Sequence, residues 1–359
     1  MTHPYTVMLL IPTGIGAAMG GYAGDGLPIA RAMAQVAGRL ITHPNVLNGA
    51  QLYWPLTNGF YVEGYGLDRF AAGEWGLRPV NNNRVALVLD RGIEPELRVR
   101  HRQAAEAARA TLGLYLLDDI ILTDQPLGSQ LQITAAGASW GTLAAPDSLL
   151  RAAERAFQQG ADAVAVVARF PDLDTDFGLA TLTSHYAQGQ GVDPIAGLEA
   201  IISHLVVRQF GKPCAHAPAF APFALDPTVD PRAAAEELGH TFLPCVLVGL
   251  SRAPQFVLSR TGSQAGDIWS EQVDALVVPA DACGGAAVLA LAERVQIIAV
   301  NDNTTTMQVS PSDLGIPAIT VNSYLEALGI LVAHKAGIDP IALQPRIPSL
   351  QEWDPLALH

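Results

Sequence analysis

Cys283 stands between residues 274–280, an apolar run that predicts a buried strand, and two glycines that open a predicted helix. Unpaired amides and the dipole at a helix start stabilise a thiolate. Gly284 and Gly285 leave room for a substrate and expose N–H groups that suit an oxyanion or a carboxylate. Asp281 opposes this effect, because a nearby negative charge raises a thiol pKa. We expect a reactive or ligand-contacting thiol here, and packing in the core is the alternative.

A second cysteine, Cys214, lies two residues before His216 in a short predicted strand, so both side chains share one face. Such a pair lowers the thiol pKa and produces a nucleophile. The preceding helix adds Glu199 as a ligand contact. A weaker alternative is a metal site built on His204, His216 and His240, although their spacing matches no zinc finger or metalloprotease.

A glycine-rich loop, residues 14–25, follows the first predicted strand. Glycines permit positive φ and close approach of the backbone to a ligand. Bare amides ahead of a helix suit a phosphate or a carboxylate. The loop lacks the Gly-Lys-Ser/Thr of a P-loop and the spacing of the dinucleotide fingerprint. We expect it to bind a small anion, and a purely structural loop is the alternative. The ligand-binding residues of this loop are predicted to be Gly14, Gly16, Gly20, Gly21 and Asp25.

Polar side chains follow two further predicted strands. His43 and Asn45 come directly after one of them and offer a general acid or base and an amide; organising a turn is the alternative role. Asn301, Asn303 and Thr304 follow the other. Loops at the carboxyl ends of parallel strands meet at one edge of the sheet, where ligands bind. We therefore expect these residues to contribute to a single site.

The elements that must position these residues alternate along the chain. Continuous apolar runs separated by helices predict an α/β fold with a largely parallel sheet, Rossmann-like βαβ units and helices on both faces. The apolar run 245–250 predicts one more such strand. A break at residues 125–146 predicts an N-terminal lobe, 1–140, with the glycine loop and a C-terminal lobe, 141–359; one continuous domain is the alternative.

Composition narrows the partners and the compartment. The 359 residues carry a net charge of −13 and are 50% hydrophobic, and no basic cluster occurs, so neither nucleic acid nor an anionic membrane is expected as a partner. Three cysteines are too few for a disulfide framework and fit a reducing compartment. No apolar run reaches the ~18 residues of a membrane span, and no signal peptide is evident. We expect a cytoplasmic protein, and its small residues and aromatic stretch favour a homo-oligomer.

Several long strings resemble a family of cyanobacterial and plastid proteins of about this length that carries only a domain-of-unknown-function label. They are "IPTGIGAAMGGYAGD", "THPNVLN", "GVDPIAGLEAIISH", "PCAHAPA", "TFLPCVLVGLSRAPQ" and "ACGGAAVLAL". The resemblance spans nearly the whole chain and implies no activity; plant members would lie in the plastid stroma. A looser similarity, in architecture only, links Cys214 and Cys283 with the facing cysteines of cofactor-independent amino-acid racemases.

These patterns together predict an enzyme that acts on a small anionic metabolite, with Cys283 or Cys214 as nucleophile or acid/base and His216 or His43 transferring protons. Acyl transfer, hydrolysis and isomerisation remain open. The alternatives are a non-catalytic metabolite- or nucleotide-binding regulatory protein and, third, a metal-dependent enzyme. No motif specifies a cofactor.

Overall fold

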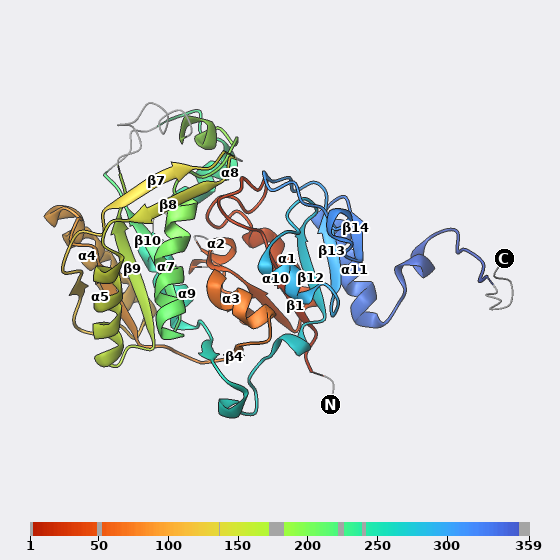
Figure 1. The fold of residues 1–359 in the computed structure, drawn as a ribbon, viewed down its shortest axis with the longest axis horizontal. Coiled ribbons are helices and arrows are strands. Elements are labelled where there is room, and N and C mark those ends of the chain that lie inside the picture. The colour runs from red at the N-terminus through yellow and green to blue at the C-terminus, as the bar shows by residue number, and fades with distance from the viewer. Residues whose placement is uncertain are drawn as a thin grey trace.

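A computed structural model describes residues 3–48, 52–135, 137–171, 183–221, 226–238 and 242–351. Within these residues the molecule has two parallel sheets side by side (Figure 1). The larger sheet has six strands in the order β14-β13-β12-β1-β2-β3. Its strands are β1 Thr6–Leu9, β2 Arg39–Thr42, β3 Gly59–Tyr61, β12 Ala275–Pro279, β13 Gln296–Val300 and β14 Ala318–Val321. The predicted α/β fold with a largely parallel sheet is confirmed.

The second sheet has four parallel strands in the order β10-β9-β5-β6. Its strands are β5 Val85–Leu89, β6 Ile121–Leu122, β9 Ala163–Arg169 and β10 Cys214–Ala219. Nearly every residue of β5 and β9 is buried, because helices cover both faces, and this explains their unbroken runs of Val, Ala and Leu. Two antiparallel pairs complete the described strands: β4 Gly76–Arg78 with β11 Gln255–Val257, and β7 Ser129–Ile133 with β8 Ser139–Leu143.

Helices fill the crossovers and the space between the sheets, where α2, α3, α7 and α9 lie (Figure 1). Their bounds are α1 Leu27–Val36, α2 Pro44–Leu47, α3 Gly64–Ala71, α4 Pro95–Leu112, α5 Pro146–Gln158, α7 Ala196–Phe210, α8 Pro231–Leu238, α9 Phe242–Ser251, α10 Ala286–Leu291 and α11 Tyr324–Ala336. Several ends follow the expected signals: Ser323 accepts a hydrogen bond from Glu326 N at the start of α11, and Gly337 ends it with φ +70°. None of the described helices is long and apolar enough to cross a membrane.

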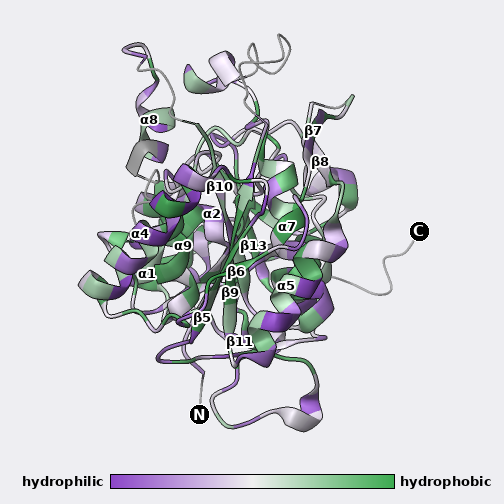
Figure 2. Cartoon of the chain, turned by 90° about the vertical axis from the view of Figure 1, so that its left-hand side faces the viewer, coloured by the Kyte–Doolittle hydropathy of each residue, from purple (hydrophilic) through white to green (hydrophobic). Residues whose placement is uncertain are grey.

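One apolar cluster contains strand residues from both sheets, among them Val7 and Val277 of the larger sheet and Val85 and Val167 of the smaller one. Leu247 of α9 belongs to the same cluster. The hydropathy colouring shows these strands as an apolar interior beneath more polar helix surfaces (Figure 2). The two sheets are therefore joined by shared packing as well as by the chain.

Two features of the fold differ from the sequence-based picture. Residues 245–250 are not a strand but part of α9, because this apolar run is buried against β5, β9 and β10 as a helix. The predicted division after residue 140 falls inside β8. The larger sheet takes strands from both ends of the chain, residues 6–61 and 275–321, and the smaller sheet takes residues 85–219.

Candidate functional site

The glycine loop leaves the carboxyl end of β1 and packs against the lobe of the smaller sheet, close to α8 (Figure 1). The carbonyl of Gly14 accepts a hydrogen bond from Ser139 N at 2.9 Å. A Cβ on Gly16 would lie 2.8 Å from the carbonyl oxygen of Gly191, and Gly16 has φ +65°. Both the close approach and the positive φ require glycine at this position. These glycines therefore join the two lobes.

Several amides of the loop are already paired with oxygen atoms of the protein. Met19 N donates to Asn303 Oδ1, Gly20 N to Asp25 Oδ2 and Ala23 N to Glu236 Oε1, each at 2.9 Å. Carboxylates of the chain thus occupy two positions where a bound anion was expected. Gly21 lies between these positions, tightly packed against the carbonyl of Ala17. The paired amides favour the structural alternative for this part of the loop.

His43 and Asn45 lie directly beneath the loop. Asn45 donates from Nδ2 to Gly20 O at 2.9 Å and accepts from Gly24 N through its carbonyl. Burial lowers the pKa of His43 to about 4, against a hydrogen bond with the backbone of Ile11. Its Nε2 is buried and has no hydrogen-bond partner among the described residues. The imidazole is therefore neutral near pH 7.

The two cysteines do not face each other. Cys214 and Cys283 are fully buried in different apolar clusters. Burial raises the pKa of Cys283 to about 11, with help from the charge of Asp281, and it raises the pKa of Cys214 well above its usual range. Thiols in this setting stay protonated and out of contact with solvent at neutral pH. The packing alternative fits both residues, and the geometry does not support a facing pair.

The residues around Cys283 also have structural partners. Asn303 is buried and donates from Nδ2 to Met19 O and to the hydroxyl of Tyr324. Thr304 accepts a hydrogen bond from Ala18 N through its carbonyl, and Asn301 N donates to Val321 O. Gly284 contacts the side chains of Met307 and Val309, and Gly285 has open space around its Cα, at the start of the six-residue α10. The polar loops therefore lie together at one edge of the sheet, as expected, but most of their polar groups are hydrogen-bonded to one another.

A line of polar side chains crosses the junction between the lobes. Glu63, which follows β3, is buried and forms an ion pair through Oε1 with Nδ1 of His204 on α7. The hydroxyl of Ser203 donates to Glu63 Oε1 at 3.4 Å and lies 3.3 Å from Nδ1 of His216. Nε2 of His216 lies 3.8 Å from Glu199 Oε2. The line thus runs from the lobe of the larger sheet to β10 of the smaller one.

Local structure positions each member of this line. Glu63 caps α3, because its Oε2 accepts hydrogen bonds from the amides of Tyr65 and Gly66. Burial lowers the pKa of His204, but the hydrogen bond and charge of Glu63 outweigh burial, and the pKa is raised. Glu199 and His216 remain partly exposed, so solvent reaches one end of the line.

A group of carboxyls adjoins Glu199. Burial raises the pKa of Glu236 on α8 to about 7, and the charges of Glu199 and Asp25 add to this. Burial and the charges of Glu236 and Glu199 raise the pKa of Asp193 well above its usual range. The hydroxyl of Tyr186 donates to Glu236 Oε1 at 2.6 Å. The titrations of Asp193 and Glu236 are therefore linked, because the ionised form of each disfavours ionisation of the other.

Asp25 connects the glycine loop with this group. It is 8% exposed and burial raises its pKa, against hydrogen bonds from Gly20 N and from Arg232, whose guanidinium lies 3.1 Å from Oδ2. Its second oxygen, Oδ1, is buried and has no hydrogen-bond partner among the described residues. A buried carboxylate oxygen without a partner is rare in folded proteins. This oxygen is therefore a candidate contact for a bound group.

We name Asp25, Asp193, Glu199, His216 and Glu236 the junction cluster. Sequence patterns singled out Asp25, Glu199 and His216, whereas Glu236 and the neighbouring Glu63 were missed. Glu63 follows a strand hidden in the aromatic stretch, and Glu236 lies on a helix and bonds Tyr186 and Ala23, which belong to other parts of the chain. The only usable signal was the position of Glu63 directly after a short apolar run.

Residues 6–344 match the family described as "Protein of unknown function (DUF3326)". The chain belongs to this family. A protein of Synechococcus sp. (strain ATCC 27144 / PCC 6301 / SAUG 1402/1), named an uncharacterized lipoprotein, is 58% identical over 341 residues, which cover 95% of this chain and 93% of the relative. The resemblance drawn from the sequence strings, including its cyanobacterial members, is confirmed.

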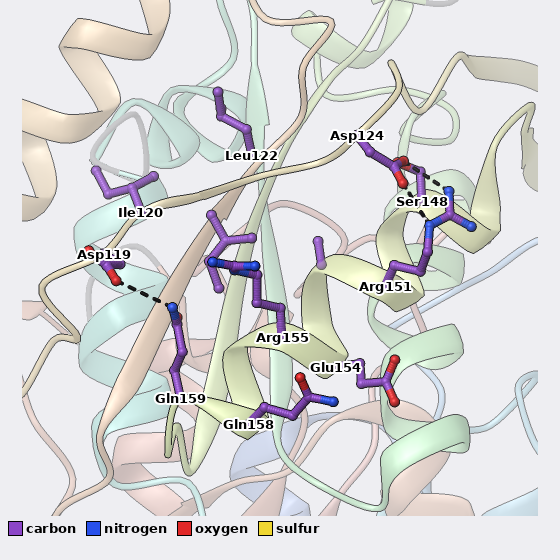
Figure 3. Close-up of a pocket in the computed structure, with 12 residues that line it drawn as sticks. Asp119, Ile120, Leu122, Asp124, Ser148, Arg151, Glu154, Arg155, Gln158 and Gln159 are labelled. Atoms are coloured by element: carbon purple, nitrogen blue, oxygen red, sulfur yellow. Dashed lines mark hydrogen bonds and ion pairs between the residues drawn. The ribbon is translucent and has the colours of Figure 1, made fainter.

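Two further features of this DUF3326 chain bear on the site. His240 lies outside the described residues, and among those that are described no group of three or more His, Cys, Asp or Glu is arranged to hold a metal ion. A surface hollow of about 690 Å³ lies between β6 and α5 (Figure 3). Its polar side chains bond one another, as Asp124 does with Arg151 and Ser148. It shares no residue with the junction cluster.

Proposed function

We propose that this DUF3326 protein is an enzyme that transfers protons on a small polar metabolite bound at the junction cluster. The observation that carries the proposal is the pKa of Glu236, about 7, beside the Glu199–His216 pair. A group that titrates near the working pH is the most effective general acid or base. Perturbed pKa values also concentrate at functional sites.

The roles follow from the positions of the side chains. His216 takes or gives the proton, and Glu199 orients its imidazole and stabilises the charged form. Glu236 supplies the second proton, which suits an isomerisation or a hydrolysis. Thiol chemistry is not part of this proposal, because Cys214 and Cys283 are buried and protonated.

The charges at the junction cluster bear on the class of substrate. Besides burial, the charges of Glu236 and Glu199 raise the pKa of Asp193, and those of Glu199 and Asp25 raise the pKa of Glu236; the guanidinium of Arg232 is already paired with Asp25. A small anion would meet like charges, which disfavour its binding. We therefore propose a neutral or cationic polar metabolite, in place of the anionic one expected from the glycine loop, with Asp25 Oδ1 as a contact.

Deuterium incorporation tests the proposed reaction. The purified full chain is incubated in D₂O with a pool of neutral and amine-bearing metabolites, and products are followed by NMR and mass spectrometry. We expect exchange or turnover of at least one metabolite. His216→Gln and Glu199→Gln should each lower that rate by about 10²-fold or more, since positioned acid–base groups contribute this much. Glu271→Gln, which removes an exposed ion pair with Arg260, is the matched control and should leave it unchanged.

A different result would change the assignment. Metabolites that raise the melting temperature without being consumed or exchanged would make the protein a non-catalytic, ligand-binding regulator. Equal activity of the wild type and both junction variants would place the reaction elsewhere in the molecule.

We also propose a cytoplasmic location. Cys214 and Cys283 form no disulfide with any described residue, in keeping with a reducing compartment. The Synechococcus relative is named a lipoprotein, so a lipid-anchored state is the competing location. Fractionation of cells that express the full chain decides between them: recovery of the protein only in detergent extracts of membranes would replace the proposal.

A further inference from the structure

After α11 the described residues continue in an arm that extends away from the body of the molecule (Figure 1). After Gly337 ends α11, a single turn at Pro340–Leu343 leads into residues 344–351. Every residue from 341 to 351 is exposed, and Leu350 is 100% exposed. Figures 1 and 2 both show this segment leaving the body. The arm thus presents Leu343, Ile347 and Leu350 to solvent.

The sequence of the arm favours this extended form. Pro340, Pro345 and Pro348 fix φ and remove backbone donors, so the arm neither continues as a helix nor pairs as a central strand. An extended segment with large apolar side chains at intervals is a ligand for an apolar surface. Burial of these side chains would be favourable, because their apolar surface would be removed from water.

α11 offers such a surface. Its inner face, with Tyr324, Ala327 and Leu331, is buried against the larger sheet. Its outer face carries a second apolar stripe of four exposed residues at helical spacing. The stripe consists of Leu325, Gly329, Val332 and Ala336. Leu325 is 80% exposed and nothing lies within 4 Å of a Cβ placed on Gly329.

A contiguous apolar patch on the surface of a protein marks an interaction site. The inner face of α11 is covered by its own sheet, so the outer stripe still lacks a cover. The stripe and the arm have the same apolar character and lie on one chain. Residues 344–351 span up to about 28 Å when extended, and a helix of thirteen residues is about 20 Å long. The arm is therefore long enough to lie along the whole stripe.

We propose that a second copy of this chain covers the stripe. In the resulting twofold dimer, each arm lies along the α11 stripe of its partner. Each copy supplies one arm and one stripe, so a single contact is made twice, as in an isologous interface. The arm leaves α11 at its C-terminal end and runs away from the body of the molecule (Figure 1), which favours exchange over folding back.

Sedimentation velocity of the full chain tests the dimer. The wild type should sediment as a dimer at micromolar concentration. Leu325→Glu on the stripe and Ile347→Asp on the arm should each shift the protein from dimer to monomer. The circular dichroism spectrum and the melting temperature of the monomer fold should be unchanged. Leu112→Asp, at an exposed leucine at the end of α4, is the matched control and should remain dimeric.

Mixing the two variants separates exchange from folding back. A heterodimer of Leu325→Glu with Ile347→Asp retains one intact arm on one intact stripe, so the mixture should contain dimers that neither variant forms alone. A wild type that stays monomeric at tens of micromolar overturns the proposal. So does a monomer that sediments with vesicles of phosphatidylglycerol and phosphatidylcholine, since a membrane would then cover the stripe.

Discussion

At the scale of single residues, burial and the negative charges of neighbouring carboxyls raise the pKa values of Asp193 and Glu236 in the junction cluster. Glu236 accepts hydrogen bonds from Tyr186 and from Ala23 N, and these favour its ionised form. Burial and the charges of Glu199 and Asp25 favour the protonated form and outweigh them. The folded protein therefore holds a proton at a carboxyl that would be ionised in the unfolded chain.

Replacing Glu236 with Gln should stabilise the protein at alkaline pH. The folded pKa, about 7, exceeds the ordinary value of 4.5, so the wild type loses stability as the pH rises from 4.5 to 7. Gln cannot ionise, and its amide oxygen still accepts from Tyr186 and Ala23 N. Above pH 7 the variant should be more stable by roughly 1–3 kcal/mol, a value reduced for partial exposure.

Urea unfolding at several pH values measures this difference. The two proteins should be equally stable below pH 4.5, where Glu236 is protonated in both folded and unfolded states. Glu271→Gln is the control and should show no such pH dependence. A wild type that is more stable than Glu236→Gln at pH 8 would contradict the raised pKa.

Sequence patterns identified part of this site. Sequence patterns predict His216 from its alternation with Cys214 on a strand and Glu199 as a ligand contact on the preceding helix, and His216 and Glu199 do lie together. Cys214 and Cys283 were selected from their neighbours in the sequence, but the chemistry of a thiol depends on its exposure, which those neighbours do not determine. Glu236 was missed because its raised pKa comes first from burial and then from the charges of Glu199 and Asp25, and the tertiary fold sets all of these.

At the scale of elements, the glycine loop is a connection between lobes. Gly14 and Gly16 lie against the segment that leads into α7. Ser139 of β8 bonds both the loop and α7, because its N–H donates to Gly14 O and its hydroxyl accepts from Gly197 N. The loop thereby sets the distance between β1 and the helix that carries Glu199. Any displacement of the loop would move the carboxyl of Asp25 relative to that helix.

Gly16→Ala should destabilise the fold by about 1–3 kcal/mol, because alanine is strained at φ +65° and its Cβ would lie 2.8 Å from Gly191 O. Gly285→Ala is the matched control, since Gly285 has an ordinary φ of −72° and open space around it. Urea unfolding of the three proteins measures both effects. Equal stability of Gly16→Ala and the wild type would mean that the loop does not hold the lobes at this distance.

Most elements could be predicted because their local signals agree. Pro231 begins α8 and Gly337 ends α11, as the start and stop signals indicate. One exception is α9, where a continuous apolar run fits a buried strand and a buried helix equally well. Only the packing of this run between the two sheets decides whether it forms a strand or a helix, and that packing is set by the whole fold.

At the scale of the whole molecule, the two sheets share one apolar cluster. The larger sheet is also completed by both ends of the chain, since β1 pairs with β12. No local signal reveals this arrangement, because the break near residue 140 is a hairpin within the lobe of the smaller sheet. Pairing between strands so far apart is decided by tertiary packing, which is why the predicted lobe boundaries do not coincide with the sheets.

The shared cluster predicts cooperative unfolding. Urea denaturation should give one transition, because opening either lobe would expose apolar residues of the other. Circular dichroism and tryptophan fluorescence should report the same midpoint, as Trp75 packs against the apolar cluster of the smaller sheet, Trp140 lies on β8 and Trp269 is buried beside Gly76 of β4. Two separated midpoints would show that the lobes are independent.

The pairing of β1 with β12 also has a consequence for biosynthesis. After β1 emerges from the ribosome, one of its two neighbours in the sheet, β12, is made more than 260 residues later. The smaller sheet, whose strands all lie within residues 85–219, is complete long before that point. The nascent chain therefore carries an unfinished, apolar amino-terminal segment through most of translation, and this interval is when the protein depends most on chaperones.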